Sequence, residues 1–275
     1  MEYHGHSSFS YICGDRITGM SHNRYFIRLA YDGSQFHGWQ RQPNGITIQQ
    51  TLEEAMSMML RSPILLTGAG RTDTGVHADE FFAHFDLAEQ LSKSECEKLV
   101  FRLNGYLGGA IALFEILPVK EDAHARFSAM SRTYRYCISR VKNPFRVNYT
   151  HYIYGDIDHV RMNLGTELIM SYNDFTSFSK VDTDTKTNIC RISVAHWVEE
   201  GRELVFTIMA DRFLRNMVRA IVGTLLELGT GKISMDDLKE IIESKNRSNA
   251  GDSVPGKGLT LYRIVYPEEI FLPHV

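Results

Sequence analysis

Alternating apolar and polar side chains mark the first strands of the chain. At residues 25–31 every second position is apolar or aromatic, which is the period of a strand with one buried face. Residues 81–85 alternate in the same way, and residues 111–119 are mostly apolar. A short apolar run at 64–66 leads into a glycine-rich segment. We expect a strand at each of these places.

Helical periodicity lies between these strands. After Thr47, apolar side chains recur every three or four residues as far as Leu60. Gln50 stands three residues after Thr47, the spacing of a capping box at a helix start. Residues 95–103 show a second helical pattern. The first half of the chain is therefore predicted to alternate strands with helices.

The second half repeats these element types without repeating their sequence. Its clearest element is a strongly apolar helix predicted at 213–228, which ends at Gly229. At 133–139 a strand pattern places Tyr134 on the same face as Tyr136. The remaining predicted elements are a helix at 160–170, a hairpin of 189–198 and 204–210, an exposed helix at 234–244 and a closing strand at 259–266.

Hairpins outnumber strand–helix–strand crossovers in this pattern, which favours an α+β fold with antiparallel sheets. We expect two similar α/β-sandwich halves of ferredoxin-like type that meet at a central basic cleft. Residues 24–122 are predicted to form the N-terminal domain and residues 123–275 the C-terminal domain. Residues 1–23 are polar and without clear periodicity, so we expect a disordered leader, with Met20 as the natural start.

The composition of the chain indicates its cellular compartment. No apolar run approaches the roughly 20 residues that a membrane span requires. The N-terminus lacks the basic start and apolar stretch of a secretory signal. The four cysteines form no C-x-x-C pair, which makes zinc and dithiol redox sites weak interpretations. Widely spaced, reduced thiols are typical of a cytoplasmic protein, and the cysteines are Cys13, Cys96, Cys137 and Cys190.

Charge is segregated along the chain. The net charge of −3 argues against a uniformly basic protein, yet residues 123–155 contain no Asp or Glu. A chain of this kind can present one basic surface while it stays near neutral overall, and such a surface can hold phosphates. The alternative is a set of solvated strand faces that happen to be basic. The basic residues of the segment are Arg126, Arg132, Arg135, Arg140, Lys142 and Arg146.

The segment most informative about chemistry is residues 70–78, Gly-Arg-Thr-Asp-Thr-Gly-Val-His-Ala. Small residues flank Asp73 and permit close approach of a ligand, with Arg71 two positions away. The segment lacks the spacing of a P-loop or a dinucleotide loop. Asp-Thr-Gly also occurs in aspartic proteases, but these need two carboxylates that share a proton, and the chain has one such tripeptide. A lone catalytic carboxylate and a turn with a capping Asp remain as alternatives.

Residues 70–78 resemble the catalytic loop of the TruA family of tRNA pseudouridine synthases. Further stretches resemble other parts of that family in the same order, so that the resemblance spans about residues 24–267. The departures are the leader and the spacing before Pro255. The further matching stretches are residues 31–40, 47–53, 124–129, 132–136, 213–219, 221–225 and 250–261.

The resemblance implies a substrate and a set of partners. The substrate is uridine at positions 38, 39 and 40 in the anticodon arm of tRNA, and the product is pseudouridine. It also implies a homodimer that holds one tRNA, with no cofactor and no metal. The chemistry agrees, because the isomerisation transfers no electrons and imports no group. The resemblance makes Asp73 the essential carboxylate, either as a nucleophile or as a base for a ribose proton.

Arg219 is our candidate for the cation that pairs with Asp73, since a guanidinium would keep the carboxylate ionised and fix its direction. On a helix at 213–228, Arg215 would share a face with Arg219. By the resemblance, Tyr134 stacks on the uracil or assists proton transfer, whereas its strand pattern alone would suit core packing. Expected RNA contacts, besides Tyr134, are Arg71, Arg41, Arg126, Arg132 and Arg215.

Two other classes of function stay open on the sequence. One is a protein that binds RNA without catalysis, which could lose Asp73 without penalty. The other is an Asp-Thr-Gly protease, which would need a second carboxylate from a partner subunit. The presence of Asp73 together with Tyr134 and Arg219 favours an active RNA-modifying enzyme.

Overall fold

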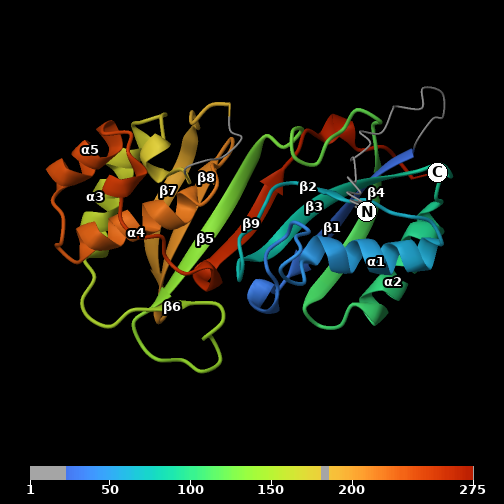
Figure 1. The fold of residues 1–275 in the computed structure, drawn as a ribbon, viewed down its shortest axis with the longest axis horizontal. Helices are drawn as coiled ribbons and strands as arrows, with labels where there is room; N and C mark the ends of the chain where they lie inside the picture. The colour runs from blue at the N-terminus through green and yellow to red at the C-terminus, as the bar shows by residue number, and fades with distance from the viewer. Residues whose placement is uncertain (1–22, 181–185, 275) are drawn as a thin grey trace, which may run out of the picture.

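The computed structural model describes residues 23–180 and 186–274, which fold around one mixed sheet of nine strands (Figure 1). Apart from Asn23, the expected leader lies outside the described residues. The main path of the sheet runs β4-β1-β3-β9-β5-β8-β7, with the short strands β2 and β6 paired to β3 and β5. The chain is thus a mixed α/β protein with a largely antiparallel sheet.

The N-terminal strands confirm most of the predicted pattern. β1 (Asn23–Tyr31) pairs antiparallel with both β3 (His77–Leu87) and β4 (Ile111–Val119). β2 (Thr67–Gly68) is short. The prediction of a strand at 64–66 is wrong: the N–H of Leu66 donates to the carboxylate of Glu53 rather than to a neighbouring strand.

Two helices lie in this half. α1 (Ile48–Leu60) begins where Thr47 accepts a hydrogen bond from the N–H of Gln50. Only this half of a capping box forms, because the Gln50 side chain bonds Glu54 instead. α2 (Lys93–Tyr106) has a complete capping box between Ser92 and Glu95.

The second half contributes the other end of the sheet. β5 (Ser131–Ser139) pairs with β8 (Glu203–Ala210), which forms the predicted hairpin with β7 (Ile192–Glu200) around Gly201 at φ 62°. The short β6 (His151–Tyr152) runs parallel to β5. The helices of this half are α3 (His159–Met170), α4 (Met217–Gly229) and α5 (Met235–Glu243).

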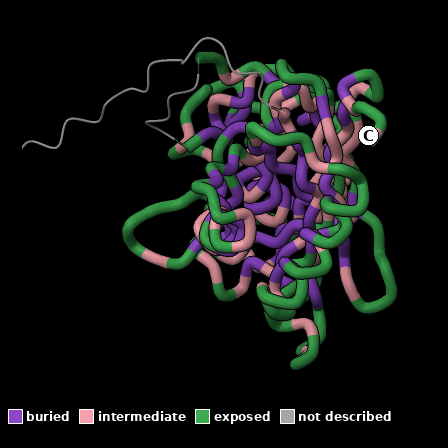
Figure 2. The backbone as a smooth tube through the Cα atoms, turned by 90° about the vertical axis from the view of Figure 1, so that its right-hand side faces the viewer, coloured by how far each residue is buried: buried purple, intermediate pink, exposed green. Residues whose placement is uncertain are grey.

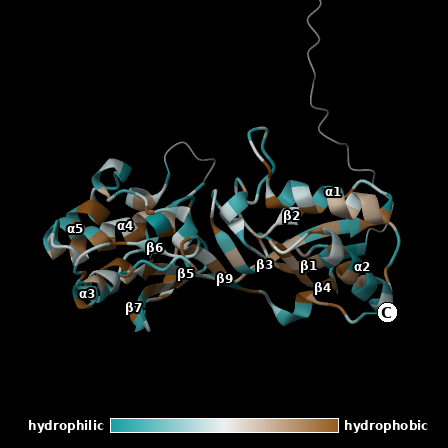
Figure 3. Cartoon of the chain, turned by 90° about the horizontal axis from the view of Figure 1, so that it is seen from below, coloured by the Kyte–Doolittle hydropathy of each residue, from teal (hydrophilic) through white to brown (hydrophobic). Residues whose placement is uncertain are grey.

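β9 (Leu259–Val265) joins the two groups of strands. It pairs parallel with β3 on one side and antiparallel with β5 on the other. The strands therefore form one continuous sheet, whereas separate sheets were expected. Figures 1 and 3 show α1 and α2 at one end of the sheet and α3, α4 and α5 at the other.

Two clusters of buried side chains match these ends. One combines β1, β3, β4, α1 and α2 with the C-terminal residues Leu261, Ile264 and Tyr266. The other combines β5, β7, β8 and the three C-terminal helices with Val76. Figure 2 shows the buried segments gathered in the middle of the molecule, with exposed loops around them. Because the chain's last strand returns to the first core, the segments around residues 73 and 219 are connected through one continuous sheet.

Candidate functional site

A tightly held loop, residues 69–76, presents Asp73 between β2 and β3. Thr72 is buried, its hydroxyl lies 2.9 Å from that of Tyr31, and its carbonyl accepts from the N–H of Trp39. At Gly38 a Cβ would lie 2.2 Å from the carbonyl oxygen of Thr72, so only glycine permits this approach. The residue before Asp73 is therefore fixed from three directions.

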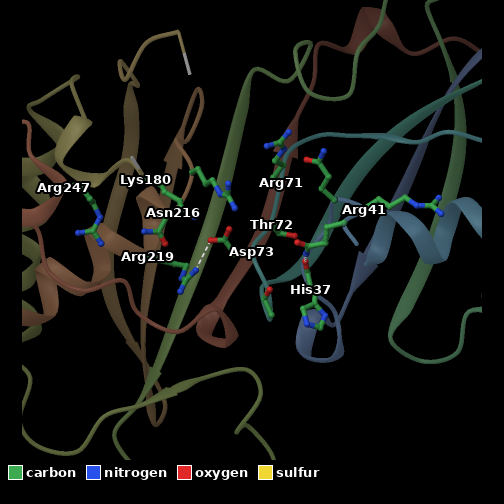
Figure 4. A pocket seen from close by; sticks show the side chains of 13 residues that line it. His37, Arg41, Arg71, Thr72, Asp73, Lys180, Asn216, Arg219 and Arg247 are labelled. Atoms are coloured by element: carbon green, nitrogen blue, oxygen red, sulfur yellow. Dashed lines mark hydrogen bonds and ion pairs between the residues drawn. The ribbon is translucent and has the colours of Figure 1, made fainter. Parts of the chain in front are cut away.

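Asp73 and Arg219 form an ion pair across the molecule. Nη1 of Arg219 donates to Oδ2 of Asp73 at 2.9 Å. Nε of Arg219 donates to the carbonyl of Val254 at 2.7 Å, which holds the guanidinium plane. The side chains are 29% exposed for Asp73 and 21% for Arg219. The pair is thus sheltered but still partly accessible, and Figure 4 marks it by a dashed line among the lining side chains.

The pair lines a cavity of about 950 Å³. Asp73 is the only carboxylate among the described residues that line it, and basic side chains surround it from both ends of the sheet. In Figure 4, Arg41 and Arg71 come from the α1 side, whereas Lys180, Asn216 and Arg247 come from the α4 side. The lining residues are His37, Gln40, Arg41, Gln42, Arg71, Thr72, Asp73, Thr74, Lys180, Arg215, Asn216, Arg219 and Arg247.

The lining cations differ in how far they are already neutralised. Arg41 lies 3.4 Å from the carboxylate of Glu53. Arg71, Lys180 and Arg215 form no ion pair with any described residue. The start of α4 adds the positive end of a helix dipole at Asn216. The cavity therefore favours an anionic ligand such as a nucleic-acid backbone.

The prediction that Arg215 lies on the same helix as Arg219 is wrong. α4 begins at Met217, because Asn216 adopts a left-handed conformation at φ 67° and interrupts the helix there. Arg215 therefore precedes the helix and does not share a helical face with Arg219. Both side chains nevertheless line the same cavity.

Tyr134 lies close to Asp73 but is not one of the lining residues. Its ring packs edge-on against Phe213, with centroids 5.1 Å apart at 89°. Burial raises the pKa of the Tyr134 phenol to about 12, and the charge of Asp73 adds to this rise while Arg132 opposes it. Such a phenol stays protonated at neutral pH. It can donate a hydrogen bond, and among the described residues its hydroxyl has no hydrogen-bond partner.

Arg132 uses its donors within the protein. Its guanidinium bonds the backbone carbonyls of Ala69, Arg126 and Asp211. It therefore positions the segment before Asp73. Its neighbour Arg126 stays exposed at the surface.

Much of the basic segment 123–155 is neutralised by glutamates of the β7–β8 hairpin. Arg135 pairs with Glu200, Arg140 with Glu199 and Arg146 with Glu203. The run of basic residues is thus partly an ion-pair network on the hairpin. The free positive charge near Asp73 comes instead from separate segments.

Sequence reasoning missed several lining residues. His37, Gln40 and Gln42 follow the first strand, and their place next to residues 70–78 depends on the loop contacts described above. Lys180 lies in an irregular segment and Arg247 begins a one-turn 3-10 helix, and neither has a periodic or motif signal in the sequence. These residues line one cavity only because the sheet brings distant loops together.

Residues 23–180 and 186–274 contain neither a clustered metal site nor a helix that could span a membrane. No group of three or more His, Cys, Asp or Glu side chains in that part of the chain has a metal-binding arrangement. None of its helices is both long and apolar enough to cross a membrane.

Comparison with known proteins adds independent information. A family model described as tRNA pseudouridine synthase matches residues 172–267. A tRNA pseudouridine synthase A of Bacteroides fragilis is 52% identical over 253 residues, 92% of this chain and 100% of the relative. A protein of the same name from Parabacteroides distasonis is 51% identical over 248 residues, 90% of this chain and 98% of the relative. Another, from Exiguobacterium sibiricum, is 36% identical over 245 residues, 89% of this chain and 97% of the relative.

Proposed function

The chain belongs to the tRNA pseudouridine synthase A family, and from that premise we propose that it isomerises uridine to pseudouridine at positions 38, 39 and 40 of the tRNA anticodon arm. The observation that carries the proposal is the Asp73–Arg219 pair at the wall of a basic cavity. A carboxylate held by a guanidinium is suited to act on a sugar, and the cations around it are suited to hold RNA.

The finer architecture is part of the same proposal. The two ends of the sheet are two similar ferredoxin-like sandwiches, and the cavity is the central basic cleft between them. The separate buried clusters support this division. A homodimer that holds one tRNA and a cytoplasmic location follow from the family resemblance and the cysteine pattern.

The reaction breaks one bond and forms another within the same nucleotide. The glycosidic bond between C1′ and N1 is cleaved, the uracil turns, and C1′ bonds to C5. The proton on C5 leaves to solvent, and N1 gains a proton. Electrons and atoms balance without an oxidant or a donor, so we propose that no cofactor takes part.

Asp73 is the proposed nucleophile at C1′, where positive charge develops as the glycosidic bond breaks. A covalent adduct would hold the sugar while the uracil turns. Abstraction of a ribose proton by the same carboxylate is the alternative route, and a slowed reaction with 2′-deuterated uridine distinguishes it. In both routes Arg219 fixes the direction in which the Asp73 oxygens point.

Tyr134 and the lining cations complete the proposed site. The ring of Tyr134 stacks on the turning uracil, and its protonated hydroxyl donates to the base. The target base has to leave its stack to reach Asp73, at a cost of a few kcal/mol. Arg71 and Arg41 hold the opened strand, Arg215 and Arg126 contact phosphates, and Arg132 supports the loop before Asp73.

The alternative functions suit the cavity less well. An aspartic protease requires a pair of carboxylates, and Asp73 stands among cations with no second carboxylate among the described lining residues. A protein that only binds RNA would not need the Asp73 carboxylate in this cavity, because the negative charge of a carboxylate repels RNA phosphates.

Release of tritium from tRNA labelled at uracil C5, followed by mapping of the modified positions, tests the proposal. We expect release by the wild-type protein and pseudouridine at positions 38 to 40. RNA binding without any release would identify a non-catalytic binder, and pseudouridine at other positions alone would overturn the proposed site of action.

A further inference from the structure

A short turn next to the cavity presents an aromatic ring and a guanidinium to solvent. Residues 124–128 close on themselves, because the N–H of His124 donates to Oγ of Ser128 and Nδ1 of His124 accepts from the N–H of Arg126. The ring of Phe127 remains 74% exposed. Cζ of Arg126 lies 5.4 Å from the centroid of that ring. The turn thus holds a cation–π pair outside either core.

Arg132 ties this turn to the loop that carries Asp73. Its Nη2 donates to the carbonyl of Arg126 at 2.6 Å and to the carbonyl of Ala69 at 3.0 Å. Two oxygens bonded to one nitrogen lie close together, so the turn is fixed beside the start of the catalytic loop. Phe127 is therefore held near the rim of the cavity.

The positive charge around this turn is not neutralised by carboxylates. Arg126 is exposed overall, yet partial desolvation lowers the pKa of its guanidinium, and the guanidiniums near it, Arg71 first, lower it further. Among the described residues no Asp or Glu forms an ion pair with any member of the group. These neighbouring guanidiniums repel one another, so binding of a polyanion such as RNA is favoured because it relieves the repulsion. The group consists of Arg71, Arg126, Arg132 and Arg212.

We infer that Phe127 is a stacking platform for an unpaired base of the substrate RNA, next to the target uridine, with Arg126 and Arg212 at the adjoining phosphates. The inference rests on the proposed function. A nucleotide that leaves its stack to enter the cavity exposes the face of its neighbour. An exposed aromatic ring at the rim covers that face, and every base has a face to offer.

The chain offers a matched control. Phe114 on β4 is 46% exposed, and the guanidinium of Arg28 lies 5.1 Å from its ring centroid. Arg28, however, is ion-paired with Glu115 and Glu80. The Phe114–Arg28 pair thus has the same chemistry without free positive charge, and neither residue lines the cavity.

The test uses an RNA stem-loop that carries 2-aminopurine next to the target uridine. Binding is measured by fluorescence, and kcat and KM by tritium release from the C5-labelled RNA. We expect Phe127→Ala to weaken binding and raise KM about tenfold, about 1.4 kcal/mol, with kcat within about twofold. Phe127→Trp restores affinity and fluorescence quenching, Phe127→Leu does not, and Phe114→Ala behaves as wild type.

Unchanged binding by Phe127→Ala, equal rescue by leucine and tryptophan, or an equal loss in Phe114→Ala overturns the stacking role. So does a dimer that dissociates in Phe127→Ala while RNA affinity stays the same, since the ring would then be a subunit contact. The two proposals fail separately. A wild-type protein that binds and quenches but releases no tritium contradicts the proposed function alone, whereas an active wild type with an unaffected Phe127→Ala variant contradicts only the stacking platform.

Discussion

Arg219 and Asp73 are 146 residues apart in the chain, and their side chains meet at 2.9 Å. The contact depends on β9 in the middle of the sheet, because its pairing with β3 and β5 brings the α4 half beside β3 and its preceding loop. The second hydrogen bond of Arg219, to the carbonyl of Val254, leaves its guanidinium little freedom to turn. The pair is therefore a built feature of the fold.

Replacement of Arg219 by glutamine should lower kcat at least about 100-fold, the range for loss of one preorganised hydrogen-bond donor at a reacting centre. Arg219→Lys should recover part of the rate, because it keeps the charge but not the two-point hold. Arg215→Gln is the control: it lines the same cavity without touching Asp73, so it should raise KM and spare kcat. Steady-state tritium release measures both constants. Equal effects of the two glutamine variants on kcat would remove Arg219 from its positioning role.

Tyr134→Phe should lower kcat about tenfold or more while KM stays within about twofold, because the ring remains and only the hydroxyl is lost. Tyr134→Ala should raise KM as well. The phenol pKa of about 12 keeps the hydroxyl protonated through the neutral range. The kcat profile should therefore show no loss from its ionisation below about pH 10. A fully active Tyr134→Phe variant would leave only stacking for this residue.

RNA affinity should fall steeply with added salt, because the lining cations release counterions from the phosphates they contact. Lys180→Gln should weaken binding and reduce the slope of log K against log salt by about one. The control is Lys239→Gln on the exposed face of α5, which should change neither. Binding isotherms at several salt concentrations measure the slope. A salt slope that Lys180→Gln leaves unaltered would argue against an RNA path over that side of the cavity.

Protein stability should depend on pH through His84. Burial lowers the pKa of His84 to about 4, helped by the charges of Arg24 and His124, and its Nδ1 accepts from the N–H of Ala125. Between about 4 and the ordinary value of 6.5, only the unfolded chain binds the proton. The neutral, buried His84 therefore contributes on the order of 3 kcal/mol to the free energy of unfolding. This contribution is complete above pH 6.5 and is lost as the pH falls toward 4. In urea unfolding, His84→Asn should flatten this decline, since asparagine accepts the same bond without titrating. If the free energy of unfolding of the two proteins fell in parallel with decreasing pH, His84 would not be the cause of the decline.

Local sequence signals predicted the elements well where side chains and backbone agree. Thr47 caps α1 as expected, and β4 has the predicted ends at Ile111 and Val119. The prediction for α4 began four residues early, because the apolar pattern continues through Phe213 while Asn216 breaks the helix in its backbone. The periodic pattern depends on which side chains are apolar, and it gives no information about a left-handed backbone conformation.

Tertiary arrangement was harder to predict. Asp73 and its loop stand out in the sequence because small residues flank one acid, whereas Lys180 and Arg247 have no local signal. The basic run around Arg135 and Arg140 looked like one surface, yet the β7–β8 hairpin supplies Glu200 and Glu199 as partners. One sheet forms rather than two because β9 pairs with β3 on one side and with β5 on the other. Pairing between strands so far apart in the chain leaves no local signal in the sequence.

The most direct test of the account is tritium release by Asp73→Asn. Asparagine keeps the size and a hydrogen-bond acceptor toward Arg219 but removes the carboxylate. The account predicts no release above background, with tRNA affinity within a few-fold of wild type because phosphate contacts dominate binding. Release at the wild-type rate by a folded Asp73→Asn protein would contradict it.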